Sequence, residues 1–169
     1  GYPIKSTPKG YRLEERPDLL QPWEFPGREA RIHCHREVAS TMSLARQLAR
    51  EGCPAFTVVT AERQTKGRGR LGRVWHSAPG GLYFTIVLRP ELPPQLSSLT
   101  TFAAGLTWVR LLREDYGLAV GLKWPNDLLA DDRKVSGMLS EMEARGDILT
   151  FVNIGIGLNV NNDPTEEEP

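Results

Sequence analysis

Residues 63–75 have the sequence Arg63-Gln64-Thr65-Lys66-Gly67-Arg68-Gly69-Arg70-Leu71-Gly72-Arg73-Val74-Trp75. Four arginines and a lysine are interleaved with three glycines, and an indole closes the run. Glycine lets a backbone approach a ligand closely, and the arginine fork matches the geometry of phosphate and carboxylate groups. The stretch therefore predicts an anion-binding loop. Because Trp75 is placed to cover a flat heterocycle, a nucleotide is the simplest ligand that accounts for all of these residues.

Two alternatives to this interpretation start from the same residues. The first is a solvated basic loop that contacts no ligand. The second is a dinucleotide-binding fingerprint, because Gly67, Gly69 and Gly72 have its spacing and follow an apolar run at residues 56–60. That fingerprint has to open a helix, whereas residues 75–81 are rich in turn-forming residues. A nicotinamide-dependent oxidoreductase is therefore weakly supported, and the sequence contains no Walker loop.

The composition is that of a soluble globular chain. Its 169 residues and 40% hydrophobic content suffice for one domain with a sizeable core. The 21 basic residues balance 21 acidic ones, so an anionic partner has to be met by a local patch. Cys34 and Cys53 form no CxxC motif and indicate free thiols in a reducing compartment. Since the sequence has no signal peptide or long apolar run, we expect a cytoplasmic protein.

The segments on either side of the loop have strand patterns. Apolar runs predict strands at residues 31–35, 56–60 and 82–88. The loop is therefore an insertion between two strands that pair with each other.

Two helices are predicted between these strands and beyond them. One begins with Ser40 as its N-cap and ends at Gly52. The other covers residues 96–115, where apolar residues recur at helical spacing until Gly117. We expect an α/β (α+β) fold, in which helices pack mainly on one face of a mixed β-sheet.

A second unusual run ends the strand predicted from residue 120, and it consists of Lys123-Trp124-Pro125-Asn126-Asp127. The last three residues are ordinary turn formers. A turn requires neither the lysine nor the indole, so contact with a ligand is the alternative explanation.

Two further strands are predicted in the remaining part of the chain. Residues 133–142 alternate like a returning strand, and Lys134 near its start faces either solvent or a ligand carboxylate. Residues 151–160 form a buried strand in which Gly155 and Gly157 share one face, where a ligand or another backbone can press close.

Residues 1–26 form a segment of their own. Residues 1–4 and 10–13 predict two short strands around a turn-prone stretch at residues 6–9. Pro17, Pro22 and Pro26 then indicate a stiff connector without helix. Residues 27–169 form the main domain.

Taken together, the motifs resemble the catalytic domain of the biotin protein ligases, a class II synthetase-like fold. These enzymes activate biotin with ATP and attach it to a carboxyl-carrier domain. The resemblance covers about residues 31–162, in the family's order: Ser40-Thr41, Gln64, Gly67-Arg68-Gly69-Arg70-x-Gly72-Arg73-x-Trp75, Lys123-Trp124-Pro125-Asn126-Asp127, Arg133-Lys134-x-x-Gly137 and Gly155-x-Gly157-x-Asn159-Val160.

The sequence departs from the pattern of this family at some points, and a sister family shares the fold. Lipoate ligases share the fold but lack the arginine-glycine loop, so biotin is favoured over lipoate. Met42 stands where many members have Asn, which concerns one polar contact near the biotin ring. The chain ends soon after Asn159, where the family continues, so residues 27–169 resemble a C-terminally truncated catalytic domain. Residues 1–20 resemble the wing of the winged-helix domain of repressor-type ligases.

The resemblance implies two acyl-transfer half-reactions, through biotinyl-adenylate, with ATP, biotin and Mg²⁺. Arg68, Arg70 and Arg73 would neutralise phosphate oxygens, and Lys134 would bridge the biotin carboxylate and the α-phosphate. Asp127 would position or deprotonate the acceptor lysine. Lys123 belongs to the implied catalytic set, and no side chain is assigned as a metal ligand.

The implied contacts to biotin and adenine come from other motifs. Ser40, Thr41 and Gln64 correspond to biotin contacts, and Trp75 and Asn159 would hold adenine. Gly137 and Gly155 would line the biotin slot. The remaining implied binding residues are Gly67 and Asn126.

The implied partner is the biotin carboxyl-carrier domain of a carboxylase, and a homodimer is compatible with the family. DNA is an expected partner only if the native protein has a full winged-helix domain. For this chain, a DNA-binding repressor is opposed by the zero net charge and by the lack of a complete recognition helix in residues 1–26. In repressor-type ligases the two functions coexist.

Overall fold

The computed structural model describes residues 3–14 and 20–162, which contain two α-helices and nine strands. Gly1 and Tyr2 of the predicted wing and Pro17 of the predicted connector lie outside these residues. None of the described helices is both long and apolar enough to cross a membrane. Short 3-10 turns occur at Pro22–Glu24, Glu29–Arg31, Arg70–Gly72 and Pro94–Leu96. The helices and strands are β1 (Ile4–Thr7), β2 (Gly10–Leu13), β3 (Ile32–Val38), α1 (Thr41–Arg50), β4 (Thr57–Gln64), β5 (Leu82–Leu88), α2 (Ser98–Glu114), β6 (Val120–Lys123), β7 (Asp127–Ala130), β8 (Arg133–Arg145) and β9 (Ile148–Leu158).

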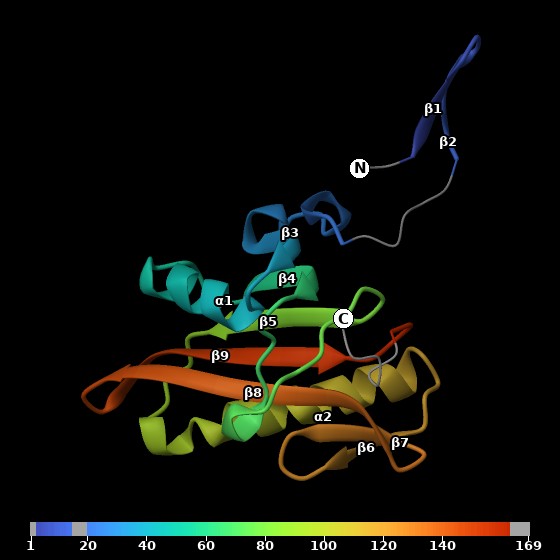
Figure 1. The fold of residues 1–169 in the computed structure, drawn as a ribbon. Helices are drawn as coiled ribbons and strands as arrows, with labels where there is room; N and C mark the ends of the chain where they lie inside the picture. Colours follow the sequence, from blue (N-terminus) through green and yellow to red (C-terminus); the bar gives the residue numbers. More distant parts are fainter. Residues whose placement is uncertain (1–2, 15–19, 163–169) are drawn as a thin grey trace.

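Seven of the strands form one mixed sheet, in the order β3-β4-β5-β9-β8-β7-β6 (Figure 1). Strands β3 and β4 are parallel and are joined through α1, and every other neighbouring pair is antiparallel. The predicted mixed sheet is confirmed. The observed bounds of β5 equal the predicted ones, whereas β4 and β3 extend further toward their C-terminal ends than predicted.

The two helices pack on opposite faces of the sheet, whereas we expected helices mainly on one face. Helix α1 packs through Ala45 and Ala49 on one buried cluster that includes Phe151 of β9. Helix α2 packs through Val109 and Leu112 on the other. Successive residues of β9 point to opposite faces, and both faces of its central part are buried, so the strand needs cover on both sides.

Helix α1 begins and ends where the sequence predicted. At its C-terminal end Gly52 has a φ of +90°, and the N–H of Cys53 donates to the Leu48 carbonyl at 3.0 Å. Many helices end in this way, with a glycine in the left-handed conformation. At the N-terminal end Ser40 occupies the N-cap position, but its side chain makes no capping hydrogen bond. The amide oxygen of Gln64 instead accepts from the Thr41 N–H at 2.8 Å.

The N-terminal hairpin is confirmed with a shifted first strand. Strands β1 and β2 pair antiparallel, so Ser6 and Thr7 belong to a strand and not to the predicted turn. The hydroxyl of Thr7 donates to the Gly10 carbonyl at 2.8 Å and closes the turn. Proline at the start of the Pro22–Glu24 turn is compatible with a 3-10 turn, although we predicted no helix there. The division of the chain at residues 26 and 27 stays a prediction.

Candidate functional site

The arginine-glycine loop is a small closed hairpin lying across the sheet. The segment between β4 and β5 crosses β9 and β8 on the α1 face (Figure 1). The loop closes on itself, since Gly69 N–H donates to the Arg73 carbonyl at 2.8 Å and Trp75 N–H donates to the Gly67 carbonyl at 3.0 Å. Leu71 and Gly72 form its tip with φ of 57° and 72°. Residues 73–81, all of them described, contain no helix, so the dinucleotide fingerprint is not completed.

A cavity of about 300 Å³ opens between this loop, the first turn of α1, the turn before β7, and strands β8 and β9. That volume is at the lower end of the range for small-molecule pockets. The lining also includes residues that the prediction had left out of the site, among them Met42, Trp124 and Gly157. The predicted site residues that line the cavity are Ser40, Thr41, Gln64, Arg68, Arg70, Arg73, Trp75, Asn126, Asp127, Lys134, Gly137 and Gly155.

Uncharged polar side chains form a connected base below the cavity. The amide oxygen of Gln64 accepts from the N–H and the hydroxyl of Thr41, at 2.8 and 3.0 Å. The amide nitrogen of Gln64 donates to Ser77 Oγ at 2.9 Å, and the Ser77 hydroxyl donates to the Trp75 carbonyl at 3.1 Å. Thr85 Oγ1 donates to Thr41 Oγ1 at 2.9 Å. Because both acceptor positions of the Gln64 oxygen are used, this side chain can offer a ligand only an N–H group.

The N-terminal turn of α1 adds one unused polar atom to the cavity wall. Ser40 Oγ is buried and has no hydrogen-bond partner among the described residues. A buried hydroxyl of this kind is a ready contact for a polar ligand group. Next to it, Met42 packs where Gly155 leaves room, since a Cβ on that glycine would lie 2.7 Å from the Met42 sulfur. The departure noted at Met42 therefore places a thioether in the cavity wall.

The indole of Trp75 lies directly on two glycines of the sheet. A Cβ at Gly157 would lie 2.5 Å from the indole, and one at Gly137 would lie 2.7 Å from it. The ammonium of Lys134 is 5.2 Å from the ring centroid. The close approach that the glycines were predicted to allow is thus made by an indole of the same chain. Contact of Trp75 with adenine stays a prediction.

Each of three predicted cations is held by an oxygen acceptor. Lys134 Nζ lies 2.9 Å from Asp127 Oδ1, and Arg68 Nη1 lies 3.0 Å from Glu141 Oε1. Arg70 Nη1 donates to Asn126 Oδ1 at 2.8 Å. The described cavity lining contains four Arg or Lys side chains and one carboxylate, so the cavity favours an anion.

Asn126 fixes the turn that carries these acceptors. Its amide nitrogen donates to the Met138 carbonyl at 2.9 Å and to Asp127 Oδ1 at 3.1 Å. One turn therefore orients the acceptors for Arg70 and Lys134 together.

Three predicted site residues do not line the cavity. Lys123 is exposed at the end of β6 and borders a separate hollow beside Asp131 and Asp132. The side-chain oxygen of Asn159 accepts from Asn162 at 3.1 Å. Gly67 faces the backbone of Trp75, where a Cβ would collide with the carbonyl oxygen, so the packing of the loop itself requires this glycine.

Sequence reasoning missed three residues that support the site. Ser77 lies in a segment that we regarded only as a turn, and Thr85 interrupts an apolar strand. Glu141 was regarded as one position of an alternating strand. A signal was available only at Thr85, where a polar side chain interrupts an apolar strand and, once buried, requires a partner. Within the described residues, no group of three His, Cys, Asp or Glu side chains gathers to hold a metal ion.

Comparison with known proteins identifies the family of this chain. The model of the biotin/lipoate A/B protein ligase family matches residues 35–159. The bifunctional ligase/repressor BirA of Bacillus subtilis is 38% identical over 174 aligned positions, which cover 98% of this chain and 54% of that protein. The biotin--[acetyl-CoA-carboxylase] ligase of Paracoccus denitrificans is 37% identical, covering 74% of this chain and 52% of the relative. The chain thus spans about half the length of these relatives.

Solved structures give the same result. The biotin protein ligase of Leishmania major in complex with biotinyl-5-AMP superposes with a TM-score of 0.67 at 33% identity, over 80% of this chain and 59% of that one. The biotin protein ligase of Aquifex aeolicus in complex with biotin and ATP superposes with a TM-score of 0.63 at 39% identity, over 82% and 54%. This chain belongs to the biotin/lipoate A/B protein ligase family, and the relatives named here are biotin protein ligases.

Proposed function

We propose that this chain activates biotin with ATP and passes the biotinyl group to a lysine of a biotin carboxyl-carrier domain. The observation that carries the proposal is the cavity itself, which combines four cationic side chains with an uncharged polar base formed by Thr41 and Gln64. A ligand with one anionic end and one neutral polar end fits that division. Relatives solved with biotin and ATP, and with biotinyl-5-AMP, support the same pair of substrates.

In the first half-reaction, an oxygen of the biotin carboxylate would attack the α-phosphorus of ATP. The bond to the bridging oxygen breaks, and pyrophosphate leaves with the electron pair. Two anions approach each other in this step, so fixed positive charge is the main contribution that the protein can make. Arg68, Arg70 and Lys134 line the cavity and would supply that charge.

In the second half-reaction, the neutral amine of the acceptor lysine would attack the acyl carbon, and AMP leaves. Asp127 would orient that amine or accept its proton. Its carboxylate is paired with Lys134 at 2.9 Å in the free chain, so Lys134 has to exchange this contact for a substrate oxygen.

The proposal includes parts that extend beyond the cavity. Magnesium would accompany the triphosphate, and the protein would act in the cytoplasm. Its acceptor would be the carrier of an acetyl-CoA carboxylase, as the name of the Paracoccus relative suggests. A homodimer would use the outer edges of β3 and β6, which end the described sheet. Contact with DNA would require a complete winged-helix domain.

Mass spectrometry tests the activity directly. The chain is incubated with ATP, magnesium and either biotin or lipoate, and the adenylate is sought in each mixture. We expect biotinyl-adenylate in the first mixture and little lipoyl-adenylate in the second. Formation of lipoyl-adenylate alone would identify a lipoate ligase instead, and the absence of both adenylates would refute adenylation by this chain.

A further inference from the structure

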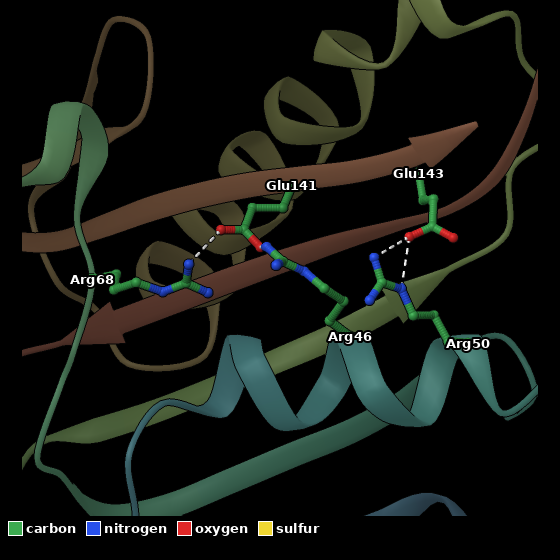
Figure 2. A network of polar contacts seen from close by, with 5 residues as sticks. All are labelled: Arg46, Arg50, Arg68, Glu141 and Glu143. Atoms are coloured by element: carbon green, nitrogen blue, oxygen red, sulfur yellow. Dashed lines mark hydrogen bonds and ion pairs between the residues drawn. The ribbon is translucent and has the colours of Figure 1, made fainter.

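A carboxylate outside the cavity joins the arginine-glycine loop to helix α1. Glu141 on β8 accepts a hydrogen bond from Arg46 of α1 through Oε2, and its Oε1 forms an ion pair with Arg68 of the loop, 3.0 Å from Nη1 (Figure 2). Each carboxylate oxygen therefore holds one arginine. The Glu141 side chain is 22% exposed, which shields both contacts from solvent more than an ordinary surface pair.

The same helix and strand contain a second ion pair that does not reach the loop. Arg50, one turn after Arg46, contacts Glu143 through Nε and Nη2, both at 2.8 Å (Figure 2). Glu143 is two positions after Glu141 and points to the same face of β8. The chain therefore contains its own matched control for the loss of a helix-to-strand ion pair.

Arg46, Arg68 and Glu141 differ in where they lie relative to the cavity. Arg68 lines it, whereas neither Glu141 nor Arg46 is among the described residues that do. The contact to Glu141 uses Nη1 of Arg68, and a guanidinium has further N–H groups in a fixed plane. We propose that Glu141 is a positioning residue: it holds Arg68 from outside the cavity, so that the remaining N–H groups meet a nucleotide phosphate.

Arg46 completes this arrangement by neutralising Glu141. An unneutralised carboxylate next to the cavity would repel the phosphate and compete with it for Arg68. With Arg46 in place, the group of two arginines and one glutamate keeps one net positive charge for the ligand. The inference rests on the proposed function only for the identity of the anion.

Positioning and simple charge balance predict opposite results for Glu141→Gln. If Glu141 only reduced the positive charge, its neutralisation would make the cavity more positive and tighten phosphate binding. If Glu141 positions Arg68, neutralisation releases the arginine and weakens binding. In pyrophosphate exchange we expect the KM for ATP to rise about tenfold, which is the effect of losing one charge-assisted hydrogen bond. The change in kcat should be smaller.

Limited trypsin digestion without any ligand gives a second measurement, which does not depend on activity. We expect faster cleavage between Lys66 and Arg73 in Glu141→Gln than in the wild type, and wild-type cleavage in Glu143→Gln. In Arg46→Gln the ion pair between Glu141 and Arg68 remains but Glu141 is no longer neutralised, so the KM for ATP should rise while cleavage stays slow. Adding Glu141→Gln to Arg68→Ala should change the KM for ATP no further.

Several results would overturn the inference. These are a lower KM for ATP in Glu141→Gln, wild-type cleavage of its loop, or equal losses in Glu141→Gln and Glu143→Gln. If Glu141→Gln does not fold, Arg46→Gln still tests the inference, since an unchanged KM for ATP or faster cleavage of its loop would contradict it. If the wild type makes no adenylate, the proposed function fails, and the digestion alone determines whether Glu141 holds the loop.

Discussion

At the scale of single residues, the cations of the cavity are held by acceptors that a substrate can replace. Arg70 donates to Asn126 at 2.8 Å, and Lys134 lies 2.9 Å from Asp127. These contacts keep the side chains extended toward the cavity without ligand, which lowers the entropy cost of binding. Exchange of one oxygen acceptor for another then preserves the number of hydrogen bonds.

Arg70→Ala should nearly abolish formation of the adenylate. The loss of one charge-assisted contact to a phosphate oxygen should cost about 2–4 kcal/mol of transition-state stabilisation, roughly a 30-fold to 1,000-fold slower reaction. Pyrophosphate exchange measures this rate. The exposed Arg36 on β3 provides the control, and Arg36→Ala should remain at the wild-type rate. A near-normal rate in Arg70→Ala would remove the loop from the mechanism.

Lys134→Ala and Asp127→Asn should affect different half-reactions. Lys134→Ala removes positive charge from the point where two anions meet, so adenylate synthesis should slow by orders of magnitude. Asp127→Asn releases Lys134 from its ion pair, so this variant should still consume ATP but transfer biotin poorly. Single-turnover assays that start from biotin and ATP, or from preformed adenylate, separate the steps. Equal losses of both steps in Asp127→Asn would indicate a role in fixing the turn.

At the scale of elements, strands β8 and β9 provide a flat surface of glycines for the indole of Trp75. The two glycines, Gly137 and Gly157, are cross-strand partners. Side chains at these positions would raise the surface and displace the ring. The glycines of the strands and the tryptophan of the loop therefore form one unit.

Gly157→Ala should disturb this unit without unfolding the sheet. The new methyl group would lie 2.5 Å from the indole, so the ring has to move. We expect a changed tryptophan fluorescence spectrum and weaker biotin binding. Gly121→Ala in β6 is the matched control, because a Cβ there meets nothing within 4 Å, and its spectrum and binding should equal those of the wild type. An unchanged spectrum in Gly157→Ala would contradict the observed packing.

Strand β3 contains a group that makes stability depend on pH. Burial, and secondarily the charge of His35, lower the pKa of His33 from its usual 6.5. The unfolded chain then binds the proton more readily than the folded chain, so stability falls as the pH drops below 6.5 and levels off below the lowered pKa. In His33→Gln, unfolding free energies measured from about pH 7.5 to about pH 5 should fall less than in the wild type.

Many of these elements could be predicted because their signals are local. The end of α1 at Gly52 and the bounds of β5 follow from residues close together in the chain. The partners across the site could not be predicted in this way. Arg46 and Glu141 are 95 positions apart, and no periodicity connects them. Likewise, the glycine at 157 indicates that something approaches closely, but only the fold identifies it as Trp75.

At the scale of the whole molecule, one strand holds two cores together. Strand β9 contributes Phe151 to the cluster under α1 and Ile154 to the cluster under α2. Both clusters therefore depend on the same backbone. The cavity lies where this strand ends, so its walls are fixed by the packing on both faces of the sheet.

Ile154→Ala should lower the stability of the whole described sheet in a single transition. The side chain is 1% exposed, and a truncation of this kind costs about 2–5 kcal/mol. At roughly 2–4 °C per kcal/mol, the Tm should fall by roughly 4–20 °C. Ile148→Ala, on the same strand but 70% exposed, should change the Tm little. Far-UV and near-UV circular dichroism should follow one curve, and two separate transitions would contradict the shared core.

The resting place of Trp75 also limits how fast a ligand can reach the two glycines beneath the indole. A ligand can occupy the space above Gly137 and Gly157 only after the indole has left it. The backbone N–H of Trp75 is bonded to the Gly67 carbonyl, so the indole leaves by rotating about its own side-chain bonds, a step whose rate does not depend on ligand concentration. At high ligand concentration the rate of uptake then becomes constant. Two ligands of unequal affinity would be captured at the same maximal speed and would differ only in how long they stay.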